Sequence, residues 1–199
     1  MARKLILAST SPIRAQLLRN AGLTFESRPA RVDEPALRAA LEAEAAKPRD
    51  VVDTLAEMKA RRVAANAPEA LVLGCDQIAE LDGRILAKPS TPDEARAQLS
   101  DLSGKTHRLL SAAVVYDGAQ PVWRHVGVVR LTMHELSPGF IKDYVARNWP
   151  GIGESVGGYK IEEEGVRLFS KIEGDFFHIL GLPLTEFLSF LVTRGELPI

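Results

Sequence analysis

Apolar residues along this chain come in short runs that end at serine, glycine, aspartate or proline. The runs 5–8 and 71–75 contain almost only apolar residues, which is typical of strands buried on both faces. The ranges 106–116 and 122–133 are rich in β-branched and apolar residues and flank Asp117-Gly118, a dipeptide that favours a tight turn. We therefore predict two buried strands and, between 106 and 133, a long hairpin.

Helical segments begin where a capping residue precedes proline or acidic side chains. Ser11 with Pro12 suits a helix start, and Gly22 suits its end. Thr91 and Ser137, each followed by proline, predict two more helices. The remaining expectations are a helix over 35–47 starting at Pro35, an interruption at Pro48, a helix capped by Asp50 and running to about Ala65, a short hairpin over 78–86, a glycine-rich loop over 151–158, a strand over 166–172 and a last helix from Leu182-Pro183.

The order of these elements indicates the fold class. Helices and strands are intermixed, but strand-rich and helix-rich stretches cluster, which favours an α/β fold (an α+β mixed sheet with helices around it) over a regular doubly wound fold. The chain has no Gly-x-Gly-x-x-Gly dinucleotide fingerprint. Its 199 residues suffice for one domain, or for two lobes around a cleft.

Composition excludes several classes of protein. Hydrophobic residues make up 46% and charged residues 26%, as in ordinary soluble domains, and the net charge of -1 gives no electrostatic case for nucleic acid. A single cysteine, Cys75, excludes an intrachain disulfide and fits a reducing compartment. The apolar stretch before Ser9 is shorter than a signal-peptide core, and no run approaches the ~20 apolar residues of a membrane span. We expect a cytoplasmic protein that has no contact with membranes.

The first helix start suits phosphate. Its free N–H groups and helix dipole favour negative charge, and Ser9, Ser11 and Arg14 lie beside them. Taken alone, the segment is better interpreted as an ordinary strand-to-helix turn, because it has no glycine-rich phosphate loop.

Charged side chains at the ends of other predicted elements favour the phosphate-binding interpretation over an ordinary turn. Asp76 ends the buried strand 71–75 and needs a cation or donors there; it suits Mg²⁺ binding or proton transfer from water. Glu34, Lys59 and Lys88 each have a simpler explanation, as a helix-start acid or a solvated lysine. Together, however, these carboxylates and cations form the set that phosphate-ester chemistry needs.

The remaining candidates have structural explanations. Cys75 is best interpreted as a small buried residue that finishes a strand. The four histidines show no spacing typical of a metal site. Trp123 and Trp149 are interpreted as packing residues, with lining of a base pocket as the alternative for Trp149.

Seven segments in a fixed order now carry a family resemblance over nearly the whole chain. They are LILASTSPIRAQLL from Leu5, VDE at 32–34, LAEMKA at 55–60, GCDQ at 74–77, LAKP at 86–89, LSGKTH at 102–107 and IEGDFFHILGLPL at 172–184. The chain resembles the Maf-type nucleoside triphosphate pyrophosphatases. The resemblance implies one Maf/ITPase-like domain over 1–199, with an elongated mixed sheet flanked by helices and a cleft between two lobes. It also implies a homodimer, and hydrolysis of a nucleotide to its monophosphate and pyrophosphate with a divalent metal (Mg²⁺ or Mn²⁺).

The resemblance also implies roles for the polar residues above. Arg14 with Ser9 and Ser11 grips the phosphates, and Glu34 and Asp76 bind the metal. Lys59 and Lys88 neutralise phosphate charge, and Asp76 accepts the proton of the attacking water.

Four positions bear on which nucleotide is used. Gln77 and Glu162 resemble the branch that acts on 7-methyl-GTP, and a carboxylate suits a cationic methylated base. Ile13 departs from that branch, which has an aromatic residue there, and Ala87 replaces the usual glycine before Lys-Pro. A dTTP/UTP pyrophosphatase, a phosphomonoesterase and a binding regulator of septum formation without turnover remain as alternatives.

Overall fold

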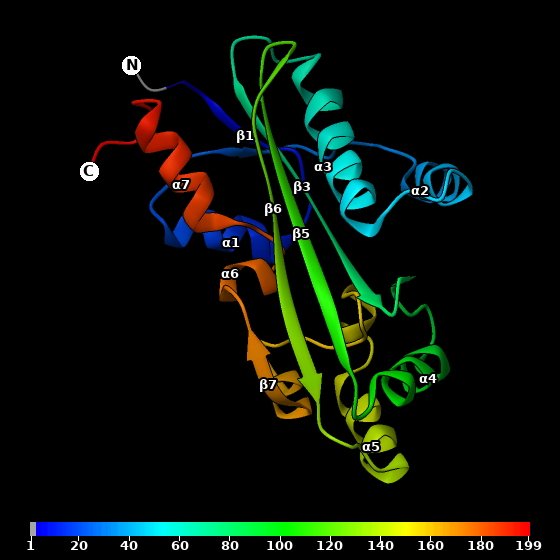
Figure 1. Cartoon of the computed structure of the whole chain (residues 1–199). Helices are drawn as coiled ribbons and strands as arrows, with labels where there is room; N and C mark the ends of the chain where they lie inside the picture. The colour runs from blue at the N-terminus through cyan, green and yellow to red at the C-terminus, as the bar shows by residue number, and fades with distance from the viewer. Residues whose placement is uncertain (1–2) are drawn as a thin grey trace. The chain divides into compact units, whose positions relative to one another are not determined.

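The polypeptide passes four times between two compact units of a computed structural model that describes residues 3–199. The first unit comprises Met1–Asp76, Ser111–Gly127 and Phe176–Ile199, of which residues 3 onwards are described. The second comprises Gln77–Leu110 and Val128–Asp175. The long strands β3 (Leu71–Leu81), β5 (Thr106–Asp117) and β6 (Gln120–Met133) each contribute residues to both units (Figure 1).

The strands pair in the order β2-β1-β3-β5-β6-β7, and β4 pairs with β3. Strand β1 (Leu5–Leu7) is parallel to both β2 (Glu26–Ser27) and β3, with Ile6 opposite Val72. Strand β4 (Arg84–Leu86) is antiparallel to β3, and β7 (Phe169–Glu173) is antiparallel to β6. The sheet is therefore mixed, which confirms the predicted α/β class.

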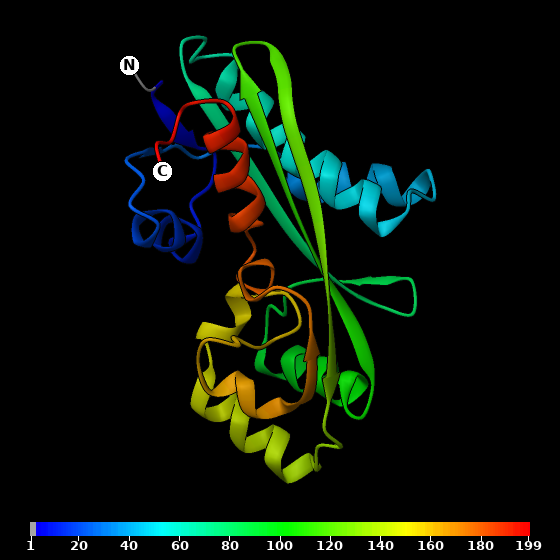
Figure 2. The ribbon, with the colours of Figure 1, turned by 60° about the vertical axis from the view of Figure 1, so that its left-hand side comes forward.

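In the first unit, helices cover both faces of the sheet. Helix α3 (Pro48–Ala64) lies on one side, and α1 (Pro12–Asn20) and α7 (Leu184–Thr193) lie on the other (Figure 1, Figure 2). The unit also contains α2 (Glu34–Ala43) and the short α6 (Phe176–Ile179). Leu55 on α3, Leu73 on β3 and Phe187 on α7 are fully buried, so apolar side chains fill the space between the sheet and the helices on each of its faces.

The second unit packs α4 (Pro92–Leu102) against α5 (Pro138–Asn148) and includes the 3₁₀ helices Gly151–Glu154 and Glu164–Leu168. Its core holds a buried histidine: the His107 Nε2 atom lies 2.6 Å from the hydroxyl of Tyr159, and both rings contact Phe169. Burial lowers the pKa of His107 to about 4, so this imidazole is neutral at pH 7.

The locally encoded helix starts are confirmed. The hydroxyls of Ser11, Thr91 and Ser137 accept hydrogen bonds from the backbone N–H groups of Arg14, Glu94 and Phe140. These are the expected N-cap contacts, each followed by proline at the first helical position. Both predicted hairpins also form, because Asp82-Gly83 and Asp117-Gly118 sit in the tight turns.

Several predicted boundaries were wrong. Pro48 begins α3 instead of interrupting the chain, so Asp50 lies in the first turn and Lys47 takes the cap position; proline is well suited to the first turn because its missing N–H is not needed there. Helix α2 runs over Glu34–Ala43, and β7 starts at Phe169 because Glu164–Leu168 is a 3₁₀ helix. The short α6 was not predicted.

Two packing interpretations are confirmed. Cys75 is fully buried, and burial raises the pKa of its thiol to about 11, so it is not a nucleophile at neutral pH. The indole of Trp123 stacks on Phe190 of α7 with ring centroids 5.4 Å apart. Within residues 3–199, none of the helices has the length and apolar character needed to cross a bilayer.

Candidate functional site

Three charged side chains from three elements meet in the first unit. The ammonium of Lys59, on α3, lies 2.7 Å from Asp76 Oδ1 on β3 and 2.8 Å from Glu34 Oε1 at the start of α2. Lys59 and Asp76 are buried, with side chains 10% and 6% exposed, whereas Glu34 is 43% exposed. One ammonium between two carboxylates offsets much of the cost of burying these charges.

The close approach of α3 to β3 depends on Gly74. A Cβ atom at this position would lie 2.3 Å from the carbonyl oxygen of Ala56 and 2.5 Å from the amide nitrogen of Ala60. Both contacts are to the backbone of α3, which cannot rotate away as a side chain can. Only glycine lets the helix approach the strand at this distance. This close approach allows Lys59 on α3 to reach Asp76, which lies two residues after Gly74 on β3.

The position of Asp76 corrects one expectation. The aspartate does not end a strand but lies in the middle of β3, which continues to Leu81. Its Oδ1 bonds to Lys59, while Oδ2 is buried and accepts no hydrogen bond from any residue in the range 3–199. The guanidinium of Arg38, on α2, forms an ion pair with Oδ2 at 3.9 Å. An uncompensated carboxylate oxygen is costly inside a protein, so Oδ2 is the atom in this cluster that most needs a partner.

Sequence reasoning overlooked Arg38. The signal was available, because Arg38 follows Glu34 by four residues and such pairs share one face of a helix. With it, the cluster contains two carboxylates and two cations.

The polar groups at the start of α1 lie where the sequence predicted, and they already form hydrogen bonds within the protein. The Arg14 guanidinium donates to the carbonyls of Gly181 (2.8 Å) and Cys75 (3.1 Å) and lies 3.5 Å from the Ser9 hydroxyl. Ser9 Oγ also accepts from the N–H of Ser11, whose own hydroxyl caps α1. The hydrogen bonds to carbonyls hold Arg14 in one orientation beside the strand end of β1.

Other candidates lie elsewhere. Ile13 is half-buried on α1 in the first unit. Gln77, Lys88 and Glu162 belong to the second unit, where Gln77 is half-buried and the other two are exposed. Lys88 lines a pocket of about 320 Å³ together with residues of α4. The structure thus brings together Glu34, Lys59 and Asp76, and separately Arg14 with Ser9; the roles of the other residues stay predictions.

The Glu34–Asp76 pair fits a hard divalent cation. Glu34 Oε1 and Asp76 Oδ1 lie 2.8 and 2.7 Å from the ammonium of Lys59, and Asp76 Oδ2 is buried and accepts no hydrogen bond from residues 3–199. Oxygen donors of this kind are what Mg²⁺ and Mn²⁺ prefer.

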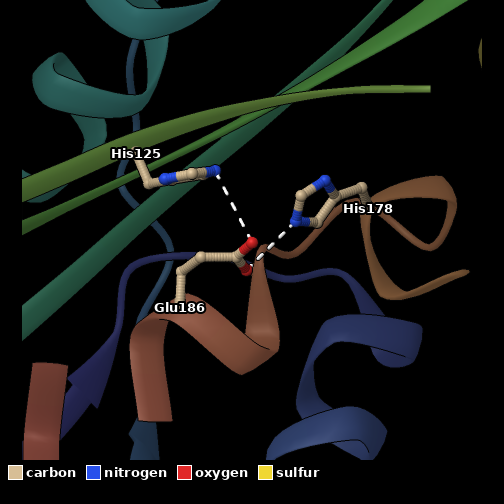
Figure 3. Close-up of side chains that lie close together, drawn as sticks. All are labelled: His125, His178 and Glu186. Carbon is tan, nitrogen blue, oxygen red and sulfur yellow. Dashed lines mark hydrogen bonds and ion pairs between the residues drawn. The ribbon is translucent and has the colours of Figure 1, made fainter. Parts of the chain in front are cut away.

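A second polar cluster in the first unit was not foreseen. His125 on β6, His178 on α6 and Glu186 on α7 point their polar atoms at one another (Figure 3). The Nε2 atom of His178 lies 3.1 Å from Glu186 Oε2, and that of His125 lies 3.8 Å from Glu186 Oε1. Burial lowers the pKa of His125. His178 and Glu186 lie eight residues apart, but His125 comes from a distant segment, so no local spacing signals this cluster.

Comparison with known proteins gives a consistent result. The Maf-like protein family matches residues 4–194. The chain is 58% identical to the nucleoside triphosphate pyrophosphatase of Ruegeria pomeroyi, over 98% of both chains. It is 49% identical to the 7-methyl-GTP pyrophosphatase of Mesorhizobium japonicum, over 99% of both. Among solved structures it is similar to a HAM1 protein from Coxiella burnetii, with 17% identity, a TM-score of 0.48 and coverage of 96% of this chain and 99% of that one.

Proposed function

This chain belongs to the Maf family, and from that premise we propose that it hydrolyses a nucleoside triphosphate to the monophosphate and pyrophosphate with Asp76 as the general base. Relatives at 58% and 56% identity, both aligned over 98% or more of their length, carry the name nucleoside triphosphate pyrophosphatase, which supports the enzyme class. The observation that carries the role of Asp76 is its Oδ2 atom, which is buried and accepts no hydrogen bond within residues 3–199.

The two carboxylate oxygens of Asp76 have different proposed roles. Lys59 donates a hydrogen bond to Oδ1, which fixes the plane of the carboxylate. One lone pair of Oδ2 is assigned to the attacking water molecule. In the proposed step the water oxygen bonds to the α-phosphorus, and one proton of the water passes to Oδ2. The bond from the α-phosphorus to the oxygen that bridges to the β-phosphate breaks, so that pyrophosphate leaves with that oxygen.

Cationic side chains balance the charge of the substrate. A triphosphate brings about three to four negative charges, so several positive groups are needed to stabilise the leaving pyrophosphate. We assign Arg14, with Ser9 and Ser11, to phosphate binding, and Lys59 and Lys88 to charge neutralisation. A divalent cation, Mg²⁺ or Mn²⁺, held by Glu34 and Asp76 supplies further Lewis-acid stabilisation of phosphate oxygens when bound.

The choice of nucleotide is assigned to Gln77, Glu162 and Ile13. A relative named 7-methyl-GTP pyrophosphatase is 49% identical, which supports a modified purine nucleotide as one substrate. Glu162 is exposed on a turn, and its carboxylate suits the N–H edge and positive charge of a methylated guanine. Ile13 offers an apolar contact in place of an aromatic stacking partner.

The proposed reaction is tested by product analysis. Purified protein is incubated with Mg²⁺ or Mn²⁺ and a panel of 7-methyl-GTP, GTP, dTTP, UTP, CTP and ITP. We expect monophosphate and pyrophosphate in equal amounts, with 7-methyl-GTP the best substrate. Release of orthophosphate instead would identify a phosphomonoesterase, and preferred turnover of dTTP or UTP would remove Gln77 and Glu162 from the specificity assignment.

The role of Asp76 is tested by Asp76→Asn. The amide keeps the shape of the side chain but cannot accept the proton, so kcat should fall by about 10³-fold or more. Asp93→Asn is the matched control, because Asp93 is 86% exposed on α4 and should leave turnover unchanged. Full pyrophosphate release by the Asp76→Asn protein would exclude the assigned role.

Two further expectations accompany this proposal. Nucleotide binding without turnover in the wild-type protein would favour the regulator of septum formation over the enzyme. The homodimer stays a prediction, and sedimentation equilibrium measures it directly.

A further inference from the structure

We propose that His125, His178 and Glu186 form a second divalent-cation site, selective for Zn²⁺-like metals and independent of the Glu34–Asp76 pair. The three residues bring two imidazole nitrogens and a carboxylate together from β6, α6 and α7. Two histidines and one carboxylate form a common ligand set of transition-metal sites in proteins. This proposal does not depend on the catalytic assignment above.

The spacing of the donor atoms fits metal coordination. All three lie within 4.8 Å of one another, and the two histidine–glutamate distances are 3.1 and 3.8 Å. Two ligands that each bind at about 2.1 Å in a tetrahedral site are about 3.4 Å apart. Small rotations of His125 and Glu186, whose side chains are 36% and 33% exposed, are enough to reach that spacing.

The surrounding structure orients the ring of His178. The side chain of His178 is only 8% exposed, and its ring lies against Gly127, where a Cβ atom would be 2.0 Å from Nδ1. Its backbone carbonyl accepts a 2.6 Å hydrogen bond from the buried hydroxyl of Ser111. One imidazole is thus oriented by packing, while His125 and Glu186, which are more exposed, point toward it (Figure 3). A metal site with one ligand already in place loses little entropy on binding.

The pocket beside the cluster leaves room for a fourth ligand. His125 and Glu186 line an open pocket of about 450 Å³ that also includes Trp123. Three protein ligands with access to solvent leave one position for water, as in Zn²⁺ sites that are not purely structural. The nitrogen donors favour Zn²⁺, Co²⁺ or Ni²⁺ over Mg²⁺, which prefers oxygen.

The fluorescence of Trp123 allows metal binding at the cluster to be measured. The Trp123 ring stacks on His125 with centroids 6.3 Å apart, so a paramagnetic ion bound at His125 quenches its fluorescence. The chain has two tryptophans, and Trp149 belongs to the second unit. A Trp149→Phe background therefore makes Trp123 the only indole. Full-length protein freed of metal by a chelator is titrated with Co²⁺, and Zn²⁺ is then added as a competitor.

We expect saturable quenching that Zn²⁺ reverses and Mg²⁺ does not. His125→Gln and Glu186→Gln should each weaken Co²⁺ binding by about tenfold or more. Both residues are partly exposed, so these variants keep the fold. His134→Gln is the matched control, because His134 is exposed and lies outside the cluster; it should bind Co²⁺ as the parent does. Zn²⁺ should raise Tm in the parent protein but not in His125→Gln, since a ligand stabilises only the state that binds it.

Two results would overturn the proposal. Equal quenching in the parent and His125→Gln proteins would show that the ion does not bind at the cluster. Loss of quenching in Asp76→Asn would assign the ion to the Glu34–Asp76 pair instead.

Discussion

The two polar clusters of the first unit have opposite arrangements of charge. At Asp76, one ammonium sits between two carboxylates; at Glu186, one carboxylate sits between two imidazoles. The first leaves a buried oxygen without a donor among residues 3–199, which suits water and hard cations. The second places two imidazole nitrogens beside one carboxylate, which suits softer metals. If both proposals hold, the two sites of this unit compete little for the same ion, because their donor atoms differ.

Each cluster also depends on one glycine, but in different ways. Gly74 allows the backbone of α3 to approach β3, whereas Gly127 makes room for the ring of His178. A backbone atom cannot leave its place without moving the whole helix, whereas a side-chain ring can rotate. The clusters should therefore respond to the same substitution with different losses of stability.

The largest effect is expected for Gly74→Ala. The added methyl group overlaps the backbone of α3 at Ala56 and Ala60, so the helix must shift and the unfolding free energy should fall by about 3 kcal/mol. Pyrophosphate release should fall as well, because Lys59 moves with α3. Urea unfolding and turnover measure the two losses. Gly139→Ala is the control, since its methyl group meets nothing within 4 Å. Equal stability of the two variants would contradict the close approach.

A buried histidine outside both clusters provides the next test. His107 has its pKa lowered to about 4 by burial, from an ordinary value of 6.5. Between these values the unfolded chain binds a proton that the folded protein does not, so stability falls as pH falls through this window. We expect a loss of about 2 kcal/mol from this group between pH 7 and pH 5.

Urea unfolding across this pH range, in the wild type and in His107→Gln, isolates the contribution of His107. The variant should lose less stability than the wild type as the pH falls. His134→Gln, at an exposed histidine, should retain the wild-type slope. The same slope in all three proteins would show that the unfolded and folded forms protonate His107 alike.

The smallest loss of stability is expected for Gly127→Ala. Its methyl group would meet the Nδ1, Cε1 and Cγ atoms of His178 at 2.0, 2.3 and 2.7 Å, so the whole side chain must turn about its χ1 angle, at a cost of about 1 kcal/mol. The rotated ring no longer faces Glu186, so Co²⁺ quenching of Trp123 should be lost although the protein stays folded. Retained quenching in Gly127→Ala would show that the methyl group does not displace the His178 ring, which would contradict the role given to Gly127.

Local patterns predicted much of the fold because their causes lie within a few residues. The caps at Ser11, Thr91 and Ser137 and the turns at Asp82-Gly83 and Asp117-Gly118 depend on neighbouring backbone groups alone. Boundaries such as Pro48 were misjudged because proline both ends one segment and starts the next. The position of Asp76 was misjudged because a buried strand and a strand end contain the same local residues, and only pairing with neighbouring strands shows that β3 continues.

Residue order and spacing are enough to predict the family, the mixed α/β class, the helix starts and the residue types available for phosphate chemistry. These features depend on neighbouring residues in the chain. Folding alone joins Lys59 to Glu34 and Asp76, leaves Asp76 Oδ2 without a donor among residues 3–199, and brings His125, His178 and Glu186 together. The physical reason is that such contacts require the close packing of elements distant in sequence, and that packing is set by the whole core and not by any one segment.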